Sequence, residues 1–143
     1  MPLAGITQDV VFKTAPLAAD RKNQVAVHFP ATFDPSAPFV LCVFMHGLGR
    51  DGSPEDHIGA AITQIASSST NALLVAPRFG DGTDPGAFLD VAGFSSFVAE
   101  LRAVLPTSAG VADHAATTAP IVLVGFSGGW RPLDAVLKKR GLI

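Results

Sequence analysis

The residues best suited to chemistry lie near the C-terminal end of the chain, in the segment Gly125-Phe126-Ser127-Gly128-Gly129. An unbroken apolar run, Ile121–Val124, precedes this segment, and a helix-like stretch over Trp130–Arg140 follows it. A serine among glycines between a buried strand and a helix is typical of a nucleophile elbow, a sharp turn that side chains on its neighbours would obstruct. The sequence therefore favours nucleophilic attack by Ser127, with the next helix N-terminus facing the negative charge that develops. A flexible glycine-rich turn without chemistry is the alternative interpretation.

A second glycine-containing segment follows another apolar run. Residues Phe39–Met45 are apolar without interruption and lead directly into His46-Gly47-Leu48-Gly49. Apolar runs without alternation are typical of strands that are covered on both faces, as in parallel sheets. We therefore predict that Phe39–Met45 forms a central strand.

These two segments, in this order and each after a predicted strand, resemble the α/β-hydrolase family, most closely its esterase- and lipase-like members. The residues that carry the resemblance are Phe44-Met45-His46-Gly47-Leu48-Gly49 and Gly125-Phe126-Ser127-Gly128-Gly129. The resemblance implies hydrolysis of carboxylic esters or related acyl compounds, with Ser127 as the nucleophile and no cofactor. It also implies an oxyanion hole made by the backbone N–H groups of Leu48 and Gly128, each donor typically worth about 3 to 4 kcal/mol of transition-state stabilisation.

The chain departs from the family pattern after the serine. Family members place an acidic residue and then a histidine after the nucleophile. Here only residues 128–143 follow Ser127, and they contain one acid, Asp134, and no histidine. A single βαβ unit takes roughly 30 residues or more. The resemblance therefore covers the N-terminal half of the family fold, ending after the elbow helix, and the catalytic triad is incomplete within this chain.

The histidines in the chain are possible substitutes for the missing base. His46 adjoins the expected oxyanion loop and is a possible accessory residue, although in the family such a histidine shapes the loop. We expect His57 to lie at the surface near a helix N-terminus, and His28 and His114 to be structural or solvated. An unaided serine is a poor nucleophile, because its hydroxyl keeps its proton without a base.

Strand and helix patterns alternate along most of the chain. The predicted strands are Gln8–Lys13, Gln24–Phe29, Phe39–Met45, Leu73–Ala76 and Ile121–Val124, and the predicted helices are 53–68, Gly93–Leu105 and Trp130–Arg140. We interpret Thr107–Pro120 as an irregular connection. The alternation predicts an α/β fold with flanking helices and a mostly parallel sheet of about five strands, as a truncated α/β-hydrolase fold in one partial domain, residues 1–143.

Composition excludes several classes of function. The chain has 143 residues, a hydrophobic fraction of 48% and a net charge of −2, which gives no basic surface for nucleic acid. No apolar window reaches the length of a membrane span and no secretory signal is found, so we expect a cytoplasmic protein without a membrane partner. Asp81 and Asp84 faintly resemble a calcium loop, but the twelfth-position glutamate is missing, so we predict no metal.

The incomplete sheet predicts association. If the fold stops after the elbow helix, Ile121–Phe126 is an apolar edge strand without a protective charge, which is an association site. We therefore expect a homo-oligomer or a complementing chain at this edge. Three functions remain open: a serine hydrolase completed by a partner, a catalytically inactive binding or assembly module, and a fragment of a larger hydrolase.

Overall fold

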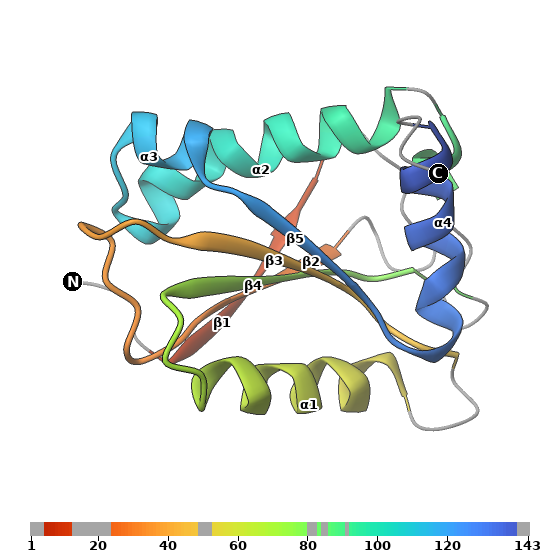
Figure 1. Ribbon diagram of the computed structural model, residues 1–143, viewed down its shortest axis with the longest axis horizontal. Helices are drawn as coiled ribbons and strands as arrows, with labels where there is room; N and C mark the ends of the chain where they lie inside the picture. The colour runs from red at the N-terminus through yellow and green to blue at the C-terminus, as the bar shows by residue number, and fades with distance from the viewer. Residues whose placement is uncertain are drawn as a thin grey trace.

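The computed structural model of the protein describes residues 5–12, 24–48, 53–79, 83, 86–90 and 92–139. At its centre is a five-stranded sheet that passes through the middle of the molecule (Figure 1). In spatial order the strands are β1 (Ile6–Val11), β2 (Gln24–Phe29), β4 (Ala72–Pro77), β3 (Val40–Met45) and β5 (Ile121–Gly125).

The sheet is mixed, which corrects the expectation of a mostly parallel sheet. β3 pairs in parallel with both β4 and β5, whereas β2 is antiparallel to both β1 and β4. Parallel neighbours require a crossover connection, usually a helix. Helices separate β3 from β4 and β4 from β5, whereas no helix lies in the described residues 30–39 between β2 and β3. The alternation of strands and helices therefore begins only at β3.

Helices cover both faces of the sheet (Figure 1). α1 (Pro54–Ala66) lies against one face, and α2 (Gly93–Ala109) with α3 (Asp113–Thr118) lies against the other. A short 3₁₀ segment, η3 (Gly86–Leu89), precedes α2. α4 (Trp130–Lys139) follows the end of β5 and packs against η3 and the ends of β3 and β5. The chain therefore has three layers, with the carboxyl ends of β3 and β5 next to α4.

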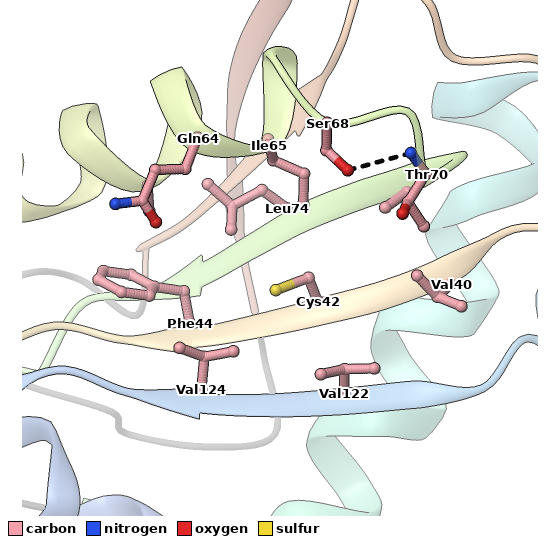
Figure 2. Close-up of a pocket in the computed structure, with 12 residues that line it drawn as sticks. Val40, Cys42, Phe44, Gln64, Ile65, Ser68, Thr70, Leu74, Val122 and Val124 are labelled. Carbon is pink, nitrogen blue, oxygen red and sulfur yellow. Dashed lines mark hydrogen bonds between the residues drawn. The ribbon is translucent and has the colours of Figure 1, made fainter.

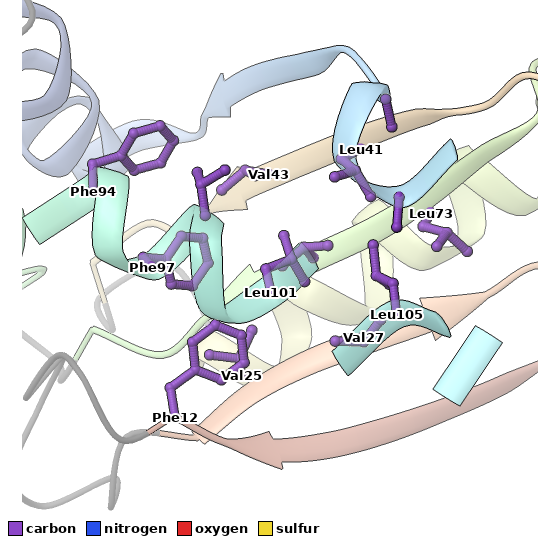
Figure 3. Packing of buried hydrophobic residues seen from close by; sticks show 14 of the residues in the cluster. Phe12, Val25, Val27, Leu41, Val43, Leu73, Phe94, Phe97, Leu101 and Leu105 are labelled. Carbon is purple, nitrogen blue, oxygen red and sulfur yellow. The ribbon is translucent and has the colours of Figure 1, made fainter. Parts of the chain in front are cut away.

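The larger core lies between the sheet and α2, where four side chains of the helix stack over the strands (Figure 3). These four residues are Phe94, Phe97, Leu101 and Leu105. A smaller cluster packs α1 against the opposite face. Burial of one such side chain typically stabilises the fold by about 1.5 to 3 kcal/mol. The two cores together fix the sheet that carries the site.

Local sequence signals explain where α1 begins. The Ser53 side chain accepts a hydrogen bond from the Asp56 N–H, and the Asp56 carboxylate accepts one from the Ser53 N–H, which forms a capping box. Two helical elements differ from the sequence expectation. α2 continues through Pro106 to Ala109, four residues beyond its predicted end, and α3 occupies part of the stretch that we interpreted as irregular.

No helix in the described part of the chain has both the length and the apolar character needed to span a membrane.

Candidate active site

Ser127 lies on a sharp turn at the tip of β5. The preceding residue, Phe126, is extended, and Ser127 itself has a φ of 49° at the start of η4 (Ser127–Gly129), which leads into α4. Residues other than glycine rarely adopt positive φ, because the side chain crowds the backbone, and such strained positions cluster at functional sites. The Ser127 side chain is exposed. The predicted order of strand, strained serine and helix is therefore present.

Backbone contacts hold this turn in place. The Phe126 N–H donates to the carbonyl oxygen of Met45 at 3.0 Å, and the Gly129 N–H donates to the carbonyl oxygen of Phe126 at 2.8 Å. Gly129 is buried and approaches the Met45 carbonyl so closely that a Cβ atom there would collide with it. A glycine is therefore required at position 129, because only hydrogen allows the α4 N-terminus to sit on the end of β3.

The His46-Gly47-Leu48 loop lies against the elbow. A Cβ atom at Gly47 would lie 3.0 Å from the Cβ of Ser127, and a Cβ atom at Gly128 would lie 2.5 Å from the Cγ of Leu48. The turn after β3 and the turn after β5 are thus in van der Waals contact. Within the described residues, neither the Leu48 N–H nor the Gly128 N–H donates a hydrogen bond. Two donors on adjoining backbones, with no acceptor among the described residues, suit the binding of an oxyanion.

His46 is buried behind this loop, with both ring nitrogens engaged. Its Nε2 accepts a hydrogen bond of 2.9 Å from the Phe79 N–H, so Nδ1 carries the proton and lies 2.9 Å from the carbonyl oxygen of Gly47. The ring therefore joins the turn after β3 to the residues after β4. Because the Nε2 lone pair is already occupied, this arrangement makes His46 a positioning group for the Gly47–Leu48 peptide and leaves no free nitrogen to accept a proton from Ser127.

Thr83 is a site residue that the sequence analysis did not single out. Its side chain is fully buried and donates a hydrogen bond of 3.0 Å to the carbonyl oxygen of Gly128. Its φ of 51° is unusual for a β-branched residue. The sequence places it in a loop without periodicity, and the only available signal was a threonine among glycines and aspartates. Thr83 orients the peptide that follows Gly128 and so the end of the elbow.

His57 lies under the elbow, which corrects the expectation that it is a surface residue. Its side chain is buried, and its ring centroid is 5.0 Å from that of Phe126, one residue before Ser127. The helix N-terminus places His57 at the carboxyl end of the strands, and Phe126, at the tip of β5, covers it. Sequence spacing alone does not reveal this contact, because it joins positions far apart in the chain.

The remaining candidates lie away from Ser127. Asp134 faces along α4 and pairs with Lys138 at 2.8 Å. His28 is buried in β2 beside Thr7, with 3.0 Å between the Thr7 Oγ1 and the His28 Nδ1. His114 is exposed on α3, which precedes the other end of β5. Asp81 and Asp84 lie outside the described residues.

Within the described part of the chain, the site therefore brings together a strained serine, two backbone donors and two positioning side chains. Among the described residues, no side chain makes a hydrogen bond with the Ser127 hydroxyl. Comparison of the sequence with protein-family models and with curated proteins finds no match.

Proposed function

We propose that the protein is a serine hydrolase of carboxylic esters or related acyl compounds and that it belongs to the α/β-hydrolase family. The observation that carries the proposal is the exposed Ser127 at a φ of 49°, on the tip of β5 and in contact with the loop after β3. Ser127 is exposed and adds nothing to the core, yet its positive φ costs free energy. A turn with a purely structural role would have glycine at this position, because glycine adopts positive φ without strain.

The proposed reaction is acyl transfer in two steps. The Ser127 Oγ attacks the ester carbonyl, and the N–H groups of Leu48 and Gly128 stabilise the negative oxygen of the tetrahedral intermediate. His46 holds the Gly47–Leu48 peptide, which carries the Leu48 N–H, and Thr83 holds the peptide that follows Gly128 and so restrains the Gly128 backbone. In this proposal a second chain supplies the base that removes the serine proton; among the described residues, no side chain bonds to the Ser127 hydroxyl.

A fluorophosphonate probe with a fluorescent tag tests the proposal. We expect covalent labelling of the purified protein and its loss in Ser127→Ala. Ser95→Ala is the matched control, because Ser95 is also exposed but lies on α2, away from the elbow. Far-ultraviolet circular dichroism confirms that each variant is folded. Absence of labelling in the folded wild-type protein, at concentrations where it is associated, would exclude the hydrolase proposal.

A second candidate function is a catalytically inactive binding or assembly module. The specific observation that favours it is the lack of a hydrogen-bonded base at Ser127 within the described residues. In that case the elbow remains as a structural turn, and binding to another chain is the activity. Retained association without any labelling of Ser127 distinguishes the module from the enzyme.

A further inference from the structure

β5 is one of the two edge strands of the described sheet. β5 has β3 on one side, and in the described sheet no strand lies on its other side. Figure 1 shows β5 crossing in front of the other strands, with its edge toward the viewer. Natural edge strands usually carry lysine, proline or a bulge that prevents pairing. The residues of β5, Ile-Val-Leu-Val-Gly, include none of these.

The side chains along this edge are apolar and accessible. Val122 is 47% exposed and Val124 is 38% exposed, and both point into a groove of about 320 Å³ between β5 and α1 (Figure 2). No residue that lines the groove is charged. Two copies of such a strand therefore meet without electrostatic repulsion.

Hydrogen bonds to β3 show which backbone groups of β5 are still available. The Leu41 N–H donates to the carbonyl oxygen of Pro120 at 2.8 Å, and the Phe126 N–H donates to the carbonyl oxygen of Met45 at 3.0 Å. In a parallel ladder, alternate residues turn both backbone groups toward a given neighbour. Pro120 and Phe126 fix this alternation, so even-numbered residues bond to β3.

The odd-numbered residues Ile121, Leu123 and Gly125 therefore turn their N–H and C=O groups toward the open edge. An antiparallel partner pairs best with such a row when the two-fold axis passes beside Leu123, the middle residue of the strand. Leu123 then bonds to Leu123 of the other copy, and Ile121 bonds to Gly125. This register uses the whole strand in both copies.

We propose that two copies pair through β5 in this antiparallel register and that each copy supplies His114 as the general base for Ser127 of the other. The role of His114 rests on the proposed function, whereas the pairing through β5 does not. Ser127 lies two residues after the end of β5, and Ala119, the C-cap of α3, lies two residues before its start, so the antiparallel register brings the elbow of one copy next to the end of α3 in the other. His114 is four residues before Thr118 on the same helix, a rise of about 6 Å.

His114 is the histidine whose exposure allows it to reach another copy of the chain. The chain has four histidines, of which His28, His46 and His57 are buried and His114 is exposed. His114, Thr118 and Ala119 also line a hollow of about 330 Å³ at the start of β5. In the paired arrangement this hollow adjoins the elbow of the other copy and leaves space for an acyl substrate. The site is therefore completed by the second copy.

The proton balance of the step is simple. His114 of one copy accepts the hydroxyl proton of Ser127 of the other copy while the bond from Oγ to the carbonyl carbon forms. The same proton passes to the departing alkoxide when the ester bond breaks. Water then attacks the acyl serine, with His114 again accepting and returning a proton, which releases the carboxylic acid.

A charge-pair experiment tests the interface independently of the chemistry. In the proposed register Val122 faces Val124 of the other copy, in pairs whose side chains lie close together. Sedimentation velocity should show a dimer for the wild-type protein and a monomer for Val122→Lys/Val124→Lys. The matched control, Val122→Lys/Val124→Glu, places a lysine opposite a glutamate twice and should restore the dimer. A monomeric wild type, or a charge-swapped variant that stays monomeric while folded, would overturn the interface.

Mixed copies test the role of His114. Ser127→Ala and His114→Gln should each form dimers, with fluorophosphonate labelling absent in the first and at least about 100-fold slower in the second. An equimolar mixture that has been allowed to exchange subunits should recover labelling at about a quarter of the wild-type sites, because half of the dimers contain one complete site. Rapid labelling of His114→Gln alone, or no recovery in a mixture shown to contain mixed dimers, would overturn the assignment of His114. Neither result affects the assignment of Ser127, which the wild-type protein tests.

Discussion

The hydroxyl of Thr83 lies 3.0 Å from the carbonyl oxygen of Gly128 and donates a hydrogen bond to it. This bond joins the loop after β4 to the turn after β5, at the residue whose N–H is proposed to face the substrate. The donor is fully buried. The geometry of the elbow therefore depends on a loop that is distant in sequence.

Substitution of Thr83 by valine should loosen the elbow. We expect a loss of about 1 kcal/mol of stability, since the Gly128 carbonyl keeps a second donor, the Trp130 N–H. Labelling of Ser127 by a fluorophosphonate should slow several-fold, because the Gly128 N–H is less well oriented. Thr83→Ser, which keeps the hydroxyl, is the control and should label at close to the wild-type rate. Equal rates in the valine and serine variants would contradict a positioning role.

A methyl group at position 129 should be poorly tolerated. A Cβ atom there meets the Met45 carbonyl, so Gly129→Ala must displace the end of β3 or the start of α4. We expect a loss of about 1 to 3 kcal/mol in urea denaturation, the range for overpacked positions. Gly59→Ala is the matched control: Gly59 lies in α1 with open space around it, and alanine should stabilise that helix by about 1 kcal/mol.

The Arg78 side chain should contribute measurably to stability. It is buried and bonds to Asp9 of β1 at 2.6 Å and to Glu55 of α1 at 2.8 Å. Both carboxylates are half exposed, so solvent screening limits the loss in Arg78→Ala to about 1 to 2 kcal/mol. Chemical denaturation provides the measurement. Lys138→Ala, which breaks an exposed pair with Asp134, should change stability by less than about 0.5 kcal/mol.

Acid should weaken the fold through His28. Burial lowers the pKa of His28 below its ordinary value of 6.5. The unfolded chain therefore binds a proton more readily than the folded chain does, and stability falls as the pH drops below 6.5 toward the lowered pKa. The contribution is fully present above pH 6.5. Urea midpoints between pH 5 and 8 should fall less steeply with acid in His28→Gln than in the wild type, and an unchanged slope would contradict this origin.

The parts of the fold that sequence predicted are those with continuous apolar runs. β3 and β5 were recognisable because both consist of uninterrupted apolar residues, although β5 lies at the edge of the sheet, and the loop and elbow that follow them were recognisable from their glycines. α3 was missed because Asp113–Thr118 contains only small and polar residues, with two alanines facing the core. A helix of that composition is stabilised by its contact with α2. Such a contact produces no apolar periodicity in the sequence of α3 itself.

The contacts that complete the site were not predictable for the same reason. The burial of His57 depends on Phe126, and the role of Thr83 depends on Gly128. Each pair is separated by more than forty positions, and each includes a residue in a turn or loop that has no hydrophobic period. The sheet is mixed because β2 runs antiparallel to both β1 and β4. The apolar pattern of a strand identifies the strand but does not specify whether it runs parallel or antiparallel to its neighbours.

One-sided pairing divides the amide protons of β5 into two kinetic classes. Those of Val122 and Val124 are held by β3 and exchange with deuterium only when the sheet opens, whereas those of Leu123 and Gly125 face the edge and exchange rapidly in an isolated chain. Slow exchange at both sets, lost again on dilution, is the isotopic signature of a strand that has acquired a second neighbour.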